Sequence, residues 1–239
     1  TAASRISART RAARSVMIMR MVARLLVTFA LLACHAPPSP SAAEPQRKPA
    51  QVIAPSGAAW LERDSRAEQE KPEIVIEAMK LTNGDVVAEV GAGTGFYARR
   101  VARAVAPDGV VYANDIQPEL LAVLRQKAAE EKLSNIIPIL GEEADPKLPE
   151  GKFDWILLVD VYHELQKPEP MLAAFGKALK PSGRIALVEY RETTSHISPA
   201  HRMTKDQVLS EWVPAGFRLI EVIETMPMQR LYIFEADRR

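Results

Sequence analysis

The chain has 239 residues, of which 47% are hydrophobic and 26% are charged, with a net charge of +1. This composition is typical of a globular protein, and the length accommodates one domain and an extension. Residues 1–33 contain six arginines and no acidic residue, so the remainder is acidic. An acidic domain is poorly suited to gripping phosphates, and we therefore expect no nucleic-acid partner. The single cysteine, Cys34, excludes an internal disulfide.

Residues 1–33 are predicted to be a targeting segment. The apolar stretch 25–33 follows arginines, and it suits a signal-peptide core but is too short to span a bilayer. Its end, Leu31-Leu-Ala-Cys34, resembles a bacterial lipobox, which implies a lipid anchor on Cys34. Residues 34–57 are rich in Pro, Ser and Ala and are predicted to be a linker. We expect an exported lipoprotein that is membrane-anchored only through Cys34 and faces the periplasm.

Other destinations fit the same residues. An Arg-rich, acid-free stretch is also typical of a mitochondrial transit peptide. A plain cleaved signal, an uncleaved anchor, or a cytoplasmic protein whose signal is not used are further alternatives.

Residues 58–239 are predicted to form one domain in which helices and strands alternate. The helices are expected within 60–80, at 96–106 and 118–132, from Pro168 to the Pro181-Ser-Gly183 turn, and after a capping box formed by Thr204 and Gln207. The strands are expected at 86–90, 110–114, 136–140, 155–159, 185–189, 217–223 and 231–234. Strands separated by helices predict a parallel sheet, and the last two predict a hairpin. The expected fold is α/β, Rossmann-like and doubly wound, with a mostly parallel seven-stranded sheet and one antiparallel edge strand.

A glycine-rich turn follows the first predicted strand. Gly91, Gly93 and Gly95 allow a sharp turn and close approach of a ligand to the backbone. Asp115 lies twenty residues after Gly95, at the end of the second predicted strand, where an acid can bind both hydroxyls of a ribose. The pattern predicts a cofactor that contains adenosine.

Two residues favour S-adenosylmethionine over a dinucleotide. Phe96 occupies the place of the third glycine in the dinucleotide fingerprint G-x-G-x-x-G. Glu89, two residues before Gly91, would repel a pyrophosphate but suits the ammonium group of S-adenosylmethionine.

These segments together resemble the class I S-adenosylmethionine-dependent methyltransferases. Val87–Gly95 resembles motif I of that family, and 111–115, 141–143, 153–160 and 178–184 resemble its later motifs in order. The resemblance implies the class I methyltransferase fold and the cofactor S-adenosyl-L-methionine. The implied cofactor-binding residues are Glu89, Gly91, Ala92, Gly93, Gly95, Asp115, Ile116, Glu142, Glu143 and Asp160. Asp160-Val-Tyr-His163 and His201-Arg202 further resemble an uncharacterised group of predicted methyltransferases.

The methyl acceptor is expected at the ends of the fourth and fifth strands. That position selects Asp160, Tyr162, His163, Glu164, Glu189, Tyr190 and Arg191. His163 is the preferred general base because imidazole titrates near neutral pH, and Tyr162 is the second catalytic candidate. His163 could instead cap or pack the following loop, and Tyr162 could line an acceptor pocket or simply be a half-buried aromatic. No metal site is assigned, because His163, Glu164, His196 and His201 follow no known ligand spacing.

The leading hypothesis is a methyltransferase that acts on a small molecule by in-line transfer. A non-catalytic exported binding module that retains the fold is the alternative, and a dinucleotide oxidoreductase is disfavoured by Phe96 and Glu89. Export would separate the domain from the cytosol, where S-adenosylmethionine is made. The residues indicate no oligomeric state.

Overall fold

The computed structural model describes residues 48–238. The targeting segment predicted at 1–33 and the anchor at Cys34 lie outside the described residues. One compact unit begins at Lys48, and Ala50 within it is only 2% exposed. The folded unit therefore starts before the boundary that composition places at residue 58. In this part of the chain no helix combines the length and apolar character needed to cross a bilayer.

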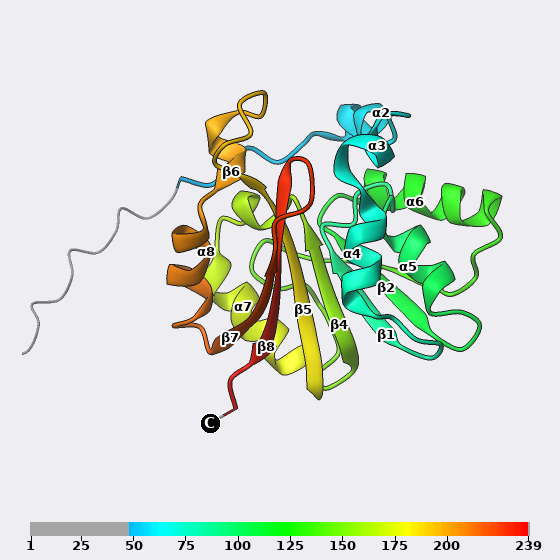
Figure 1. Ribbon diagram of the computed structural model, residues 1–239. Coiled ribbons are helices and arrows are strands. Elements are labelled where there is room, and N and C mark those ends of the chain that lie inside the picture. The colour runs from blue at the N-terminus through cyan, green and yellow to red at the C-terminus, as the bar shows by residue number, and fades with distance from the viewer. Residues whose placement is uncertain (1–47, 239) are drawn as a thin grey trace, which may run out of the picture. The chain divides into compact units, whose positions relative to one another are not determined.

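Helices and strands alternate through this unit (Figure 1). The helices are α2 (Ala58–Leu61), α3 (Arg66–Glu70), α4 (Pro72–Met79), α5 (Ala98–Ala104), α6 (Pro118–Glu130), α7 (Pro168–Ala178) and α8 (Lys205–Trp212). Short 3-10 turns are η1 (Pro55–Gly57), η2 (Tyr162–Glu164) and η3 (Pro199–His201). The strands are β1 (Val86–Val90), β2 (Val110–Asp115), β3 (Ile136–Leu140), β4 (Phe153–Val159), β5 (Leu179–Arg191), β6 (Arg202–Met203), β7 (Phe217–Ile223) and β8 (Gln229–Ala236).

The main sheet has the order β3-β2-β1-β4-β5-β8-β7, and the two-residue strand β6 pairs with β5 outside that path. Strands β1 to β5 are mutually parallel, whereas β8 is antiparallel to both β5 and β7. The predicted fold class is confirmed. The antiparallel strand β8, however, is not at the edge of the sheet. It pairs with β5 on one side and with β7 on the other, so β7, which precedes it in the chain, is the edge strand.

Two apolar layers cover the sheet, one on each face. The β1 side chains alternate, so that Val87 packs with one layer while Ala88 and Val90 pack with the other. Helices α4, α5 and α6 supply the first layer, and α7 and α8 supply the second (Figure 1). In the second layer, the Trp212 ring contacts the rings of Tyr162, Phe217 and Phe234. Each fully buried aliphatic or aromatic side chain contributes about 1.5–3 kcal/mol relative to exposure. This burial holds the strand ends, and the loops that follow them, in a fixed arrangement.

Local signals predict the element ends well, with one difference. The capping box is confirmed, since Gln207 N donates to Thr204 Oγ1 at 3.1 Å and Thr204 N donates to Gln207 Oε1 at 2.9 Å. Strand β5 begins at Leu179, before the predicted turn at Pro181, and its pairing with β4 is irregular there. A side chain on Gly183 would lie 2.6 Å from the carbonyl oxygen of Phe153, so the close approach of β4 explains the glycine.

We predict that Gly91→Ala destabilises the domain more than Gly84→Ala. Both glycines have positive φ, so alanine costs roughly 1–3 kcal/mol of backbone strain at either site. An added Cβ at Gly91 would also overlap Val161, whereas at Gly84 it would meet nothing within 4 Å. The overlap adds about 1–3 kcal/mol. Urea denaturation of the two variants measures the difference, and equal losses would contradict the packing argument.

Candidate functional site

The glycine turn lies where the strand order reverses, between β1 and β4. Open α/β sheets bind ligands at this switch point, beyond the carboxyl ends of the strands. Gly91, Gly93 and Gly95 all have positive φ, as their spacing predicts. Gly91 and Gly93 line a cavity of about 570 Å³. Gly95 is not among the lining residues, because it faces α6, where a Cβ would lie 2.8 Å from Leu124.

Asp115 ends β2 and fixes the glycine turn. One carboxylate oxygen accepts a hydrogen bond from Gly93 N at 2.8 Å, and the other accepts one from Gln117 N at 2.9 Å. Burial raises the pKa of this carboxyl, although the backbone hydrogen bonds act against the rise. Each oxygen keeps a lone pair, so the carboxylate can also accept hydrogen bonds from ribose hydroxyls.

Glu89 is a buried carboxyl that lacks a full set of partners. Its side chain is 3% exposed, and Oε2 has no hydrogen-bond partner among residues 48–238. Burial raises the pKa of Glu89 to about 8, against the opposing effect of the nearby Arg66. Burying an incompletely satisfied carboxyl is costly, and an ammonium group would relieve that cost.

Arg66 is a site residue that the sequence analysis did not identify. Its guanidinium lies over the ring of Phe96 at 4.2 Å and donates to both carboxylate oxygens of Glu70 at 3.0 Å. The side chain lines the cavity and acts electrostatically on Glu89 and Asp160. It sits on the short helix α3, far from motif I in sequence. In the sequence, the only signal that could have indicated this ion pair is the four-residue spacing between Arg66 and Glu70.

The charge of the cavity is negative. Among the described lining residues, Arg66 is the only arginine or lysine. The lining carboxyl groups belong to Glu89, Asp115, Glu142, Glu143, Asp160 and Glu164. A pyrophosphate would be repelled by this surface, whereas a ligand with an ammonium and a sulfonium would be attracted.

The remaining predicted cofactor residues also line this cavity. Ala92 N donates to the carbonyl of Asn114 at 2.8 Å, and Ile116 presents an apolar side chain that is 40% exposed. Glu142 and Glu143 are exposed at its rim, with Glu142 paired to Lys147.

Asp160 follows β4 directly, at the junction with the acceptor side. It has a φ of +52°, a left-handed conformation that is uncommon for a residue other than glycine. One carboxylate oxygen accepts from Gln229 Nε2 at 3.0 Å, and the other is buried without a partner among the described residues. Burial and the neighbouring Glu70 raise the pKa of Asp160.

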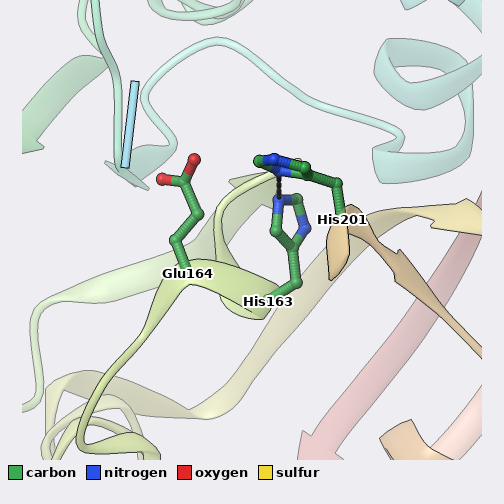
Figure 2. Close-up of side chains that lie close together, drawn as sticks. All are labelled: His163, Glu164 and His201. Atoms are coloured by element: carbon green, nitrogen blue, oxygen red, sulfur yellow. Dashed lines mark hydrogen bonds between the residues drawn. The ribbon is translucent and has the colours of Figure 1, made fainter. Parts of the chain in front are cut away.

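His163 also lines the cavity, and the carboxylate of Glu189 holds its ring. Its Nδ1 is 2.5 Å from Glu189 Oε2, and its Nε2 is 3.0 Å from His201 Nδ1 (Figure 2). Burial alone would lower the pKa of His163, but the Glu189 carboxylate raises it. Burial and the neighbouring His163 lower the pKa of His201. The preferred acceptor-side residue thus faces the cavity in a fixed orientation.

Tyr162 does not take the position that its sequence neighbourhood suggested. Its side chain is fully buried, it is not among the residues that line the cavity, and its hydroxyl donates to Glu211 at 2.7 Å. The η2 turn after β4 directs Tyr162 toward Trp212 and the adjacent His163 toward the cavity. This geometry corrects our assignment of Tyr162 as a catalytic residue and gives it a packing role.

Of the other acceptor-side candidates, Tyr190 lines the cavity and Arg191 does not. Tyr190 lines the cavity beside Asp160, whose charge raises the pKa of the phenol together with burial. Arg191 instead donates to the carbonyl groups of Met226 and Pro227, so it fastens the β7–β8 connection.

Ala50 N donates to the carbonyl of His163 at 3.0 Å, which brings the first described segment next to the site.

Comparison with known proteins agrees with this geometry. Residues 87–183 match a family model described as a methyltransferase domain. A structure of a SAM-dependent methyltransferase from Aquifex aeolicus is 27% identical, covers 77% of this chain and 98% of its own, and superposes with a TM-score of 0.73. The chain therefore shares the fold of this S-adenosylmethionine-dependent methyltransferase.

Curated relatives match over shorter ranges. The chain is 30% identical to a demethylmenaquinone methyltransferase of Tropheryma whipplei over 156 residues, which are 65% of this chain and 60% of that protein. It is 25% identical to the ubiquinone/menaquinone biosynthesis C-methyltransferase UbiE of Pseudomonas aeruginosa, over 51% of this chain and 48% of that one. The chain thus spans only about half to three-fifths of the length of these relatives.

We predict that S-adenosylmethionine binding releases up to about one proton at pH 7. A carboxyl with a pKa of about 8 is mostly protonated there, and the ligand's ammonium group favours the carboxylate, so Glu89 loses its proton on binding. Affinity should therefore rise between pH 6 and pH 7. Calorimetry in buffers of different ionisation enthalpy counts the protons.

Glu89→Gln is the matched control for this measurement. It keeps the shape of the side chain but cannot ionise, so it should bind more weakly and release no proton. Equal proton release by Glu89→Gln and the unmodified chain would assign the effect to another group.

Proposed function

We propose that this protein transfers a methyl group from S-adenosylmethionine to a small-molecule acceptor. The observation that carries the proposal is that one cavity is lined by both groups of residues. Glu89 and Asp115 have the charge that the cofactor needs, and His163 lines the same space.

The cofactor supplies an activated methyl group: the acceptor atom bonds to the methyl carbon while the methyl–sulfur bond breaks, its electron pair stays on sulfur, and a protonated acceptor releases one proton. The chain's own contribution is alignment. Asp115 and the glycine turn hold the nucleoside end, and Glu89 holds the ammonium end. Fixed alignment can supply about 7–11 kcal/mol of barrier reduction in favourable cases.

The acceptor in this proposal is an apolar ring compound with an ionisable oxygen. Val52, Ile53, Leu165, Met171 and Ile197 give the lining around His163 an apolar character. Such a surface suits an aromatic or quinone-like ring and does not suit a nucleic acid. The names of the curated relatives refer to quinone biosynthesis, so demethylated quinols are the first compounds to assay.

A binding module without turnover is the alternative. The [4+2]-cyclase SpnF has a similar fold, with a TM-score of 0.59 at 17% identity. Because a protein named as a cyclase shares this fold, the fold alone does not establish methyl transfer.

We expect His163→Ala to lose roughly a hundredfold or more in turnover while it still binds S-adenosylmethionine. The residue faces the acceptor, and removing a group that assists proton transfer costs about this much. Mass spectrometry of S-adenosylhomocysteine and methylated quinol measures turnover, and calorimetry measures binding. Binding without turnover by the unmodified chain, across quinols and phenols, would favour the binding module.

Tyr162→Phe is the matched control. It removes only the hydroxyl that bonds to Glu211, so turnover should stay within a few-fold while the free energy of unfolding falls by about 1 kcal/mol. A loss of turnover as large as that of His163→Ala would restore Tyr162 to the catalytic residues.

We further propose that the chain is exported and anchored to a membrane through a lipid on Cys34, with the domain in the periplasm. The lipobox-like residues that precede Cys34 support this proposal. Metabolic labelling with a fatty acid in a bacterial host should label the chain, and Cys34→Ser should abolish the label. Labelling that persists in Cys34→Ser, or a chain that stays in the cytosol, would contradict the proposal.

A further inference from the structure

Two imidazoles and a carboxylate converge at the acceptor end of the cavity. One ligand-type atom from each of His163, Glu164 and His201 lies within 4.8 Å of the other two. His163 and Glu164 come from the η2 turn after β4, whereas His201 ends η3, thirty-eight residues later (Figure 2). Residue spacing does not reveal this cluster, because the sheet brings its two halves together.

The distances suit a shared metal ion. His163 Nε2 and His201 Nδ1 are 3.0 Å apart, with their rings nearly perpendicular at 81°. Two nitrogens bound tetrahedrally to one zinc ion at about 2.0–2.1 Å lie about 3.3 Å apart. Opening the pair by a few tenths of an ångström therefore converts the contact into a ligand pair. Figure 2 shows the Glu164 carboxylate beside the two rings, and its ligand atom lies within 4.8 Å of theirs.

Glu189 orients the ring of His163 so that its Nε2 can act as a metal ligand. Glu189 Oε2 lies 2.5 Å from Nδ1 and, as a carboxylate, accepts a hydrogen bond from Nδ1–H, so the lone pair of the neutral ring is on Nε2, toward His201. Glu189 is itself fixed, because Tyr162 N donates to its other oxygen at 2.8 Å. A carboxylate that orients a histidine in this way is the usual outer partner of a metal-bound imidazole.

The local charge also favours a cation. Glu164 and Glu189 bring two carboxyl groups to the cluster. Arg66, the one arginine or lysine among the described lining residues, is already bound to both oxygens of Glu70.

We propose that His163, His201 and Glu164 bind a divalent transition-metal ion, with Zn²⁺ as the reference ion, and leave a coordination position open to the cavity. Two histidines and one glutamate are a ligand set of catalytic zinc sites that keep such a position. This assignment makes His163 a ligand, in place of the general base that the sequence analysis favours.

The role of the ion rests on the proposed function. A divalent ion lowers the pKa of an oxygen bound to it, which would favour the ionised form of an acceptor hydroxyl near the methyl donor. The metal-free rival is a proton relay from His163 to His201, backed by Glu189.

The test is Zn²⁺ binding to the untagged full chain, measured by competition with a chromophoric chelator. Cys34→Ser with His35→Ala serves as the background, because a neighbouring thiol and imidazole could bind zinc by themselves. We expect one Zn²⁺ per chain in this background, and visible d–d absorption when Co²⁺ replaces it. His201→Ala and Glu164→Gln should each weaken Zn²⁺ binding by at least about 100-fold, since even outer-shell changes cost 10–100-fold.

His196→Ala is the matched control for loss of an imidazole from the same cavity. Its Nε2 lies 3.0 Å from Met228 Sδ, and it is not part of the cluster, so Zn²⁺ affinity should not change. Thermal melting and S-adenosylmethionine binding report whether each variant is folded.

The outcomes separate the two proposals. No stoichiometric Zn²⁺ in the folded background chain, or equal weakening by His196→Ala, would overturn the metal site, and turnover without metal would then favour the proton relay. Zn²⁺ bound through the cluster in a chain that lacks turnover would uphold the site and remove the proposed function.

Discussion

The parallel sheet forces four carboxyl groups into one buried region. Strands β1, β2, β4 and β5 each carry an acid at or just after the carboxyl end, namely Glu89, Asp115, Asp160 and Glu189. Because parallel strands end at the same edge, these acids converge in a place with little water. Backbone N–H groups satisfy Asp115, and His163 compensates Glu189. Glu89 and Asp160 retain buried oxygens without partners among the described residues, so the native chain carries a cost that a cationic ligand removes.

The same constraint explains why the cofactor half of the site was predictable from sequence. Gly91 and Gly93 belong to one turn after β1, and Asp115 ends the neighbouring parallel strand β2, so a single strand–helix–strand unit brings them together. The fold class followed from the alternation of strands and helices, because helices of this length connect parallel neighbours. The antiparallel strand was placed at the edge, since a hairpin alone does not reveal which of its two strands pairs with the rest of the sheet.

The acceptor half was less predictable, because it depends on contacts between distant segments. Tyr162 and His163 are adjacent in sequence, and only the direction of the η2 turn decides which one faces the cavity. His201 reaches His163 through a short pairing of β6 with β5. Arg66 belongs to a helix whose lead-in looks like ordinary polar surface. The positions of His163, His201 and Arg66 in the cavity depend on contacts that form only when the whole domain is assembled, and no local sequence pattern predicts them.

The two halves of the cavity have very different structural support. Gly91, Gly93 and Asp115 follow or end strands in the middle of the seven-strand path, and packed apolar layers cover both faces of the sheet there. His201 depends on η3 and on two residue pairs, Tyr190 with Arg202 and Arg191 with Met203. Thr194 Oγ1 also donates to the Met228 carbonyl at 2.8 Å, and Glu192 pairs with Arg230, but the segment has far fewer ladder pairs than the sheet centre and opens at a lower free energy. Residues 192–200 can therefore be exchanged to vary this part of the cavity, while His201, the glycine turn and the folding core stay intact.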